Sequence, residues 1–431
     1  MRKHRWHVLA LVLTLALAGV AAGCGGDGGG GDGEAVSGEI SVLAIWAGAE
    51  QESFQTVIDG FTEANPDATV KYTSGGDNVP TLLATAIEGG NPPDVAFIAQ
   101  PGLLADLAEK GSVKPIDFAS DLVVENLGQS IADVGSVDGT LYGLLYKAAN
   151  KSTVWYNVAA FEEAGVEPSE DWDAFLESAK TINASGTPAF SIGASDGWTL
   201  TDLFENIYIR QAGVEKYDML ATHEIPWTDQ SVKDALTEMA KVVGDTENIV
   251  GGTSGALQTD FPTSVSNVFS ESPKGAMVIE GDFVPGAVES GLEAEEGYNV
   301  FTFPALNDSP PTVVGAGDFA IMLEDSPVAQ AFVEYLASAE AAELWAKRGG
   351  FSSPNKQLDT SVYPDAILQQ TAGAIGEAEV FRFDLSDVQP SAFGGTVGQG
   401  LFKLFQDFVQ KPDDVDGITQ QMEDAAAKAF G

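Results

Sequence analysis

The sequence predicts an α/β protein with two lobes. Residues 39–111 show a strand–helix–strand–helix–strand pattern, and a second set of strand and helix patterns begins near residues 153–156. Strands that alternate with helices favour a parallel sheet covered by helices on both faces. The chain of 431 residues is long enough for two or three domains, and its apolar content of 44% is ordinary for a globular protein.

Apolar periodicity predicts the elements of the first lobe. Residues 39–46 form an apolar strand pattern, and the apolar residues from Phe54 to Phe61 then recur at i, i+3, i+4 and i+7, which is one face of a helix. Asn65-Pro66 ends this helix, because the residue before a proline disfavours the helical conformation. The remaining predicted elements are strands over 69–73 and 95–98 and helices around 82–87 and 103–107.

Caps and apolar stretches predict the second set of elements. Asn157 is placed to cap one helix, and Ser326-Pro327 is a cap followed by proline at the first position of another. This second helix is expected to continue to Trp345, before Gly349 ends it. The other predicted elements are strands over 153–156, 277–279 and 299–303 and an amphipathic helix over 172–179. Three tryptophans inside these elements are predicted to be core residues: Trp155, Trp172 and Trp345.

The N-terminus has the composition of an export signal. Basic residues precede an apolar run from Val8 to Val20, and small residues lead to Cys24, the only cysteine. The run is too short to span a bilayer, which takes about 20 residues. Residues 21–24 resemble the lipobox of bacterial lipoproteins, although Ala21 stands where leucine or valine is usual. This resemblance implies a diacylglyceryl group on Cys24; an ordinary secretory signal with a chance cysteine is the alternative.

The charge of the chain is strongly negative. The sequence has 64 acidic against 21 basic residues, a formal net charge of −43. Such a charge repels nucleic acid and anionic lipid, and it disfavours a strongly anionic ligand. A high-salt or high-GC origin would produce the same bias, so the charge by itself does not identify a function.

Several short segments together resemble the extracellular solute-binding proteins of bacterial ABC importers. The resemblance is to the carbohydrate group of that family, which includes maltose-binding protein. It rests on the order and spacing of the segments and covers nearly the whole chain after the glycine-rich segment. The segments that carry the resemblance are Ile40–Trp46, Asn91–Val95, Leu141–Gly143 with Trp155–Asn157, Gly275–Gly281 and Gly349–Asn355.

The resemblance implies the two-lobed, type II fold of periplasmic binding proteins. A ligand cleft would lie between lobes joined by about three crossovers, which we place near Ala149, Ala316 and Ser352. Ligands of open α/β sheets bind at the carboxyl ends of the strands. The predicted segments are a signal peptide over 1–23, the lipidated cysteine with a flexible glycine-rich leash over 24–38, an N-terminal lobe over 39–149 and 317–352, and a C-terminal lobe over 150–316 and 353–431.

Side chains at the predicted strand ends and crossovers are the candidate ligand contacts. A sugar presents a face of C–H groups to aromatic rings and a rim of hydroxyls to carboxylates and amides. The resemblance implies stacking aromatics at Phe283 and near Phe393. Trp46 could equally belong to the core, and Asp77 and Asp318 could be turn residues beside glycine. The candidate ligand-binding residues are Trp46, Glu50, Asp77, Gln100, Asn150, Trp198, Phe283, Asp318, Asp387 and Phe393.

Other functional classes fit the sequence less well. Residues 193–197 match the G-x-S-x-G pattern of serine hydrolases, but His223 is the only histidine after the signal and follows Ser195 too closely to leave room for the usual acid. Zinc would lack ligands, and Pro412 occupies the first ligand position of the calcium-like run 413–417. We therefore expect no catalysis, no metal and no cofactor; a surface scaffold without a small ligand is a further alternative.

The resemblance implies a lipid-anchored receptor on the extracytoplasmic face of the cell membrane. It would capture a sugar or oligosaccharide and deliver it to the transmembrane subunits of an ABC permease, as a monomer and without nucleic acid. The number of candidate aromatics favours an α-glucoside or a short oligosaccharide. A glycerophosphodiester or an amino sugar is the alternative ligand.

The predicted anchor can be tested at Cys24. Because one acylated residue is the whole attachment, Cys24→Ala should release the protein into the medium or leave it unprocessed. Membrane fractionation measures this, and unchanged detergent-dependent retention of the variant would contradict the lipoprotein prediction.

Overall fold

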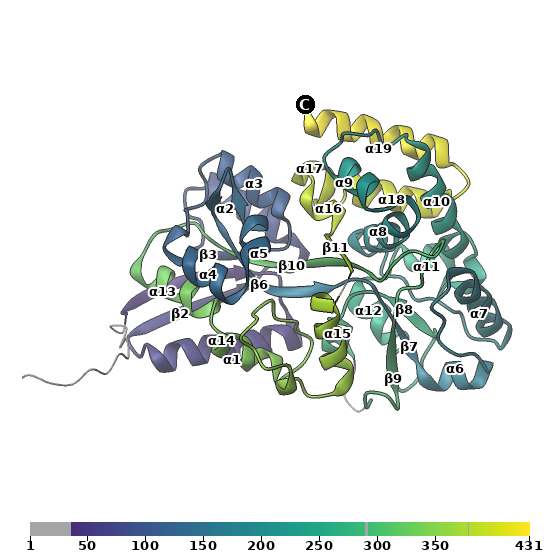
Figure 1. The fold of residues 1–431 in the computed structure, drawn as a ribbon, viewed down its shortest axis with the longest axis horizontal. Coiled ribbons are helices and arrows are strands. Elements are labelled where there is room, and N and C mark those ends of the chain that lie inside the picture. The colour runs from purple at the N-terminus through teal and green to yellow at the C-terminus, as the bar shows by residue number, and fades with distance from the viewer. Residues whose placement is uncertain (1–35, 289–291, 378) are drawn as a thin grey trace, which may run out of the picture. The chain divides into compact units, whose positions relative to one another are not determined.

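The computed structural model describes residues 36–288, 292–377 and 379–431 (Figure 1). The predicted signal, Cys24 and most of the leash lie outside the described residues. Within the described part of the chain, none of the helices combines the length and the apolar composition needed to cross a membrane.

The first lobe begins as the predicted strand–helix–strand–helix–strand unit. Strand β1 pairs in parallel with β2 on one side and with β3 on the other, which confirms the predicted parallel arrangement. The helices that connect these strands bury their apolar residues against the sheet. The elements are β1 (Gly38–Ala44), α1 (Gly48–Ala64), β2 (Ala68–Ser74), α2 (Val79–Glu88), β3 (Val95–Ile98) and α3 (Pro101–Glu109).

Two long strands, β6 (Gly143–Asn150) and β10 (Thr312–Met322), pair antiparallel and cross the molecule side by side (Figure 1). β10 also pairs antiparallel with β3 at one end and in parallel with β11 (Val380–Phe383) at the other. The sheet order is β11-β10-β3-β1-β2, with β6 on β10. The first sheet is therefore mixed rather than wholly parallel. We call the β6–β10 pair the crossing ribbon.

The three predicted crossovers are neighbours in the structure. Ala149 of β6 pairs with Ala316 of β10, and the backbone N–H of Ala148 donates to the carbonyl of Ser352 at 2.8 Å. All three chain segments therefore pass through one place, at the crossing ribbon. The bounds of the two lobes along the chain stay a prediction.

The second sheet corrects the sequence prediction of another parallel unit. β7 (Thr153–Asn157) lies between β8 (Met277–Ile279) and β9 (Tyr298–Thr302), and both pairings are antiparallel. Several helices intervene between β7 and β8. The single-helix crossover that makes neighbouring strands parallel is therefore missing here, and the alternating pattern alone could not reveal this.

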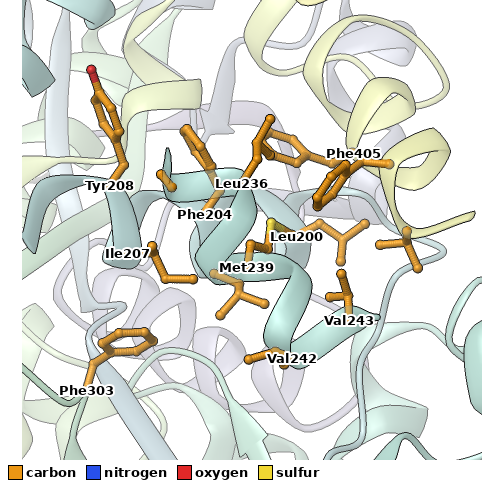
Figure 2. Packing of buried hydrophobic residues seen from close by; sticks show 14 of the residues in the cluster. Leu200, Phe204, Ile207, Tyr208, Leu236, Met239, Val242, Val243, Phe303 and Phe405 are labelled. Atoms are coloured by element: carbon orange, nitrogen blue, oxygen red, sulfur yellow. The ribbon is translucent and has the colours of Figure 1, made fainter. Parts of the chain in front are cut away.

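The largest core lies beside this second sheet, around α8 (Trp198–Ala212). Helices α10 (Gln230–Val243) and α18 (Gly400–Gln410) pack against α8, and most residues of α8 are buried. Helix α19 (Val415–Phe430) packs in turn against α10 and α18. Figure 2 shows side chains of α8, α10 and α18 gathered in this core, with Phe204 and Phe405 among them.

The predicted caps and core tryptophans are confirmed, with one correction. Asn157 accepts a hydrogen bond from the N–H of Ala160, Ser326 caps α13 (Pro327–Leu336), and the three tryptophans are buried. The helix expected to reach Trp345 is instead two helices, because Ser338 caps a new helix, α14 (Ala339–Ala346).

Shorter elements complete the described fold. Most of them are helices that flank the two sheets (Figure 1). These elements are α4 (Ser120–Asn126), α5 (Gln129–Val134), β4 (Ser136–Val137), β5 (Thr140–Leu141), α6 (Val158–Ala164), α7 (Trp172–Ala184), α9 (Val214–Ala221), α11 (Gly252–Ala256), α12 (Phe261–Ser266), η4 (Val284–Ala287), α15 (Ala366–Glu377), α16 (Leu385–Val388) and α17 (Ser391–Gly394).

Candidate ligand-binding site

A cavity of about 190 Å³ lies over the crossing ribbon, between side chains of the two lobes. Lys147 and Ala149 of β6 and Asp318 of β10 form part of its floor. All of the predicted ligand contacts except Asn150 and Phe393 line this cavity. They are Trp46, Glu50, Asp77, Gln100, Trp198, Phe283, Asp318 and Asp387.

The parallel strands explain why residues far apart in the sequence meet here. Trp46 follows β1, Asp77 follows β2 and Gln100 follows β3. Because these strands are parallel, their carboxyl ends lie at the same edge of the sheet. Reasoning from strand ends therefore placed these three side chains at the cavity.

Trp46 lines the cavity and contacts Asp318 of the cavity floor. Its indole ring is buried and packs on Phe54 and Phe97, each with ring centroids 4.6 Å away. Its Nε1–H donates to Oδ2 of Asp318 at 2.8 Å. Burial raises the pKa of Asp318 to about 6, while Lys147 and the Trp46 hydrogen bond act to lower it.

Lys147 is a cavity residue that sequence reasoning missed. Its Nζ lies 2.5 Å from Oε1 of Glu50 and 5.8 Å from the ring centroid of Phe283. Burial alone would lower the pKa of Lys147, but Glu50 and Asp318 outweigh burial and raise it, so the lysine stays charged. The available signal was a single lysine inside the otherwise apolar run 143–149.

Lys151 is the second missed lysine, and it is also fully paired. Its Nζ contacts Oδ1 of Asp202 at 2.8 Å and Oδ2 of Asp384 at 2.6 Å, and all three side chains are buried. The ammonium lies 5.4 Å from the ring centroid of Trp198. Because carboxylates already hold both lysines, neither offers a free positive charge to an anionic ligand.

Three aromatic rings form one wall of the cavity. Trp198 begins α8, Phe261 begins α12 and Phe283 precedes η4. The ring centroids are 5.3 Å apart for Trp198 and Phe261, 5.3 Å for Phe261 and Phe283, and 6.0 Å for Trp198 and Phe283. Phe261 and Phe402 also line the cavity. Neither was among the predicted ligand residues.

Asn150 and Phe393 lie outside the cavity wall, which corrects their predicted placement. The Oδ1 atom of Asn150 accepts a hydrogen bond from the N–H of Ser152, so this side chain shapes the turn after β6. Phe393 is 1% exposed and packs edge-on against Trp227 in the core. The short helix α17 turns this ring inward, and Gly395 lines the cavity instead.

The cavity wall keeps an excess of carboxyl groups. Its ionisable groups are Glu50, Asp77, Asp318 and Asp387 against Lys147 and Lys151. Burial, and then the neighbouring Asp384, raise the pKa of Asp387 well above its ordinary value. A carboxyl group with a raised pKa can donate as well as accept a hydrogen bond, depending on its protonation. The wall therefore suits neutral polar groups such as hydroxyls.

The G-x-S-x-G segment does not assemble a serine–histidine pair. The hydroxyl of Ser195 donates to Oδ1 of Asp196 at 3.0 Å. His223 instead contacts Glu423 of α19 at 3.2 Å. Among the described residues, no group of three or more histidine, cysteine, aspartate and glutamate side chains is placed to hold a metal ion.

Comparisons with known proteins agree with this architecture. Residues 47–343 match the model of the family described as bacterial extracellular solute-binding protein. The osmoprotective compounds-binding protein GgtB of Synechocystis sp. is 33% identical over 84% of this chain and 87% of its own length. The alpha-glucosides-binding periplasmic protein AglE of Rhizobium meliloti is 32% identical over 84% of this chain and 81% of its own.

The fold also has close structural counterparts. The bacterial solute receptor AcbH, which prefers β-D-galactopyranose, superposes with a TM-score of 0.81 at 19% identity. The match covers 92% of this chain and 100% of AcbH. At this identity the likeness concerns the fold, which is the two-lobed α/β fold predicted from the sequence.

The aromatic wall can be tested at Phe283. Phe283→Ala should weaken sugar binding by about 1–3 kcal/mol through lost burial and ring contact, which is roughly ten- to a hundredfold in Kd. The fold should survive, because this ring is only half-buried. Phe393→Ala is the matched control, since deleting a buried ring lowers the free energy of unfolding by about 3–5 kcal/mol. Calorimetric titration with melting curves separates the two, and lost stability with intact affinity in Phe283→Ala would contradict the stacking role.

The buried carboxyl of Asp318 predicts a pH dependence of stability. Its pKa of about 6 in the fold exceeds its ordinary value of 3.8, so the folded chain binds more protons than the unfolded chain between these values. The free energy of unfolding that this group contributes therefore increases as the pH falls through about 6. We expect the melting temperature of the ligand-free protein to rise on acidification from about pH 8 to about pH 5. Asp318→Asn, which keeps an oxygen for Trp46, should show a smaller rise; an equal rise would contradict the assignment.

Proposed function

This chain belongs to the family of bacterial extracellular solute-binding proteins, and on that premise we propose that it captures a neutral sugar or short glycoside for import. The observation that carries the proposal is the composition of the cavity wall. Aromatic rings of one lobe face strand-end carboxylates and amides of the other. Rings cover the C–H face of a sugar, and the polar groups bind its hydroxyls.

The charges of the cavity support a neutral ligand over an anionic one. Lys147 is held by Glu50, and Lys151 is held by Asp202 and Asp384. A phosphate group would meet no free cation there, and it would face Asp318 and Asp387. A glycerophosphodiester is therefore disfavoured. An amino sugar is the second candidate, because the excess carboxyl groups would favour its ammonium group.

The relatives support the more specific proposal of an α-glucoside. AglE is named for binding α-glucosides and GgtB for binding osmoprotective compounds. Both are more than 30% identical to this chain over most of its length. We therefore propose a small α-glucoside, or a comparable osmoprotective compound, as the ligand class of this chain.

The proposal includes the predicted cellular setting. Cys24 would anchor the receptor as a monomer on the extracytoplasmic face, and the glycine-rich leash would let it reach an ABC permease. The receptor itself would catalyse nothing. Ser195 contacts Asp196 and His223 contacts Glu423, so the two side chains do not form a catalytic pair, which supports this part of the proposal.

A thermal-shift screen tests the proposed ligand class. The panel contains sucrose, trehalose, maltose, glucosamine and glycerophosphocholine. A ligand at 100 times its Kd stabilises the folded protein by about 2.7 kcal/mol, so at least one neutral glycoside should raise the melting temperature. Ser195→Ala is the matched control and should show the same shift. A shift with glycerophosphocholine alone, or hydrolysis of a glycoside or ester that is lost in Ser195→Ala, would contradict the proposal.

A further inference from the structure

The crossing ribbon that forms the cavity floor has contacts between the lobes along both of its edges. Phe319 of β10 pairs with Ile98 of β3 on one side and with Leu145 of β6 on the other. Gly315 likewise has Phe383 of β11 on one side and β6 on the other. β3 and β11 therefore share one edge of the ribbon. Ser352 lies along the opposite edge, beside β6.

The first edge is closed where α3 meets α16 and α17. Leu104 of α3 belongs to a core on the first sheet, whereas Leu385 of α16 belongs to the core around α8. Gly102 makes the closest approach: a Cβ atom there would lie 1.9 Å from the carbonyl oxygen of Gln389. Close packing of these two backbones leaves no room for a ligand to pass.

Two further contacts reinforce this edge beside the cavity. The hydroxyl of Ser391 donates to Oδ2 of Asp106 at 2.6 Å. The Gln100 side chain packs on the backbone of Gly395, where a Cβ atom would lie 2.7 Å from Cγ of Gln100. Gln100 and Gly395 both line the cavity, so their contact is the cavity wall at this edge.

The second edge is closed where η4 meets the turn at residues 349–350. A Cβ atom on Gly350 would lie 3.0 Å from Cα of Gly286, and the φ of Gly350 is +63°, which favours glycine. Beside them the hydroxyl of Ser352 donates to Oδ2 of Asp282 at 2.5 Å. Two chain segments from different cores thus meet backbone to backbone at this edge as well.

From these two closed edges we infer that the cavity accepts a ligand of one or two sugar rings and excludes longer oligosaccharides. The inference rests on the proposed function. A longer chain could not continue along the ribbon past either edge, because backbone packs on backbone there. The cavity volume of about 190 Å³ agrees with this limit, since pockets that bury drug-sized ligands have about 300–1,000 Å³.

A length series of neutral glucosides on the wild-type protein tests the inference. The probes are methyl α-glucoside, trehalose, sucrose and maltose with one or two rings, then raffinose and maltotriose, then stachyose and maltotetraose. Isothermal titration should find the tightest ligand among the probes of one or two rings. The four-ring compounds should bind at least about a hundredfold more weakly, which corresponds to about 2.7 kcal/mol.

A glycine variant examines the first edge directly. Gly102→Ala adds a methyl group that must move Gln389, so it should weaken binding of the best small ligand about tenfold and narrow the preference for short over long probes. Gly373→Ala is the matched control, because Gly373 is also a helical glycine but has no atom within 4 Å of its Cβ position. It should leave both affinities unchanged.

The outcomes separate this inference from the proposed function. A tightest ligand of three or more rings, or equal affinity for maltose and maltotetraose with both bound, would overturn the size limit and leave the proposed function standing. Binding by none of the probes or of the screening panel would overturn the proposed function and the size limit with it. If Gly102→Ala melts like the wild type and keeps the same preference for short over long glucosides, the first edge does not set the size limit.

Discussion

The antiparallel pairing of β6 with β10 is the constraint on which the rest of this structure depends. β10 joins the first sheet through β3 and carries β11 at its other end, and β6 leads directly into β7 of the second sheet. The same pairing that connects the lobes also presents Lys147 and Asp318 to the cavity. The backbone hydrogen bonds of this one strand pair therefore connect the two lobes and also position part of the cavity floor.

Buried charge is the second organising feature of the molecule. Burying an ion pair has a desolvation penalty, and removing one partner is more costly still because the other charge is left uncompensated. Lys151 contacts two acidic side chains at once, Asp202 and Asp384. Burial nevertheless raises the pKa of Asp202 to about 8, so this carboxyl group keeps its proton near neutral pH. Burial also acts to raise the pKa of Asp384, but Lys151 and hydrogen bonds lower it to about 2, so Asp384 is the charged partner of Lys151.

Local signals in the sequence predicted much of the fold and eight of the residues that line the cavity. The periodicity of residues 39–111 and the caps at Asn157 and Ser326 depend on neighbours within one turn or one strand. Trp46, Asp77 and Gln100 were found because the end of a parallel strand is itself a local feature. Lys147 and Lys151 were missed because their partners lie far away in the chain: Glu50 for one, Asp202 and Asp384 for the other.

The sequence by itself determined the class of the protein: an acidic α/β chain, with aromatic and acidic side chains at strand ends and a family resemblance carried by segment order. The export signal stays a prediction from the sequence. Only the tertiary structure decided the antiparallel second sheet, the inward turn of Phe393 and the role of Trp46 as a hydrogen-bond donor to Asp318. It also decided that the cavity is closed at both ribbon edges. These outcomes depend on pairings between residues far apart in the chain, which local periodicity and composition do not encode.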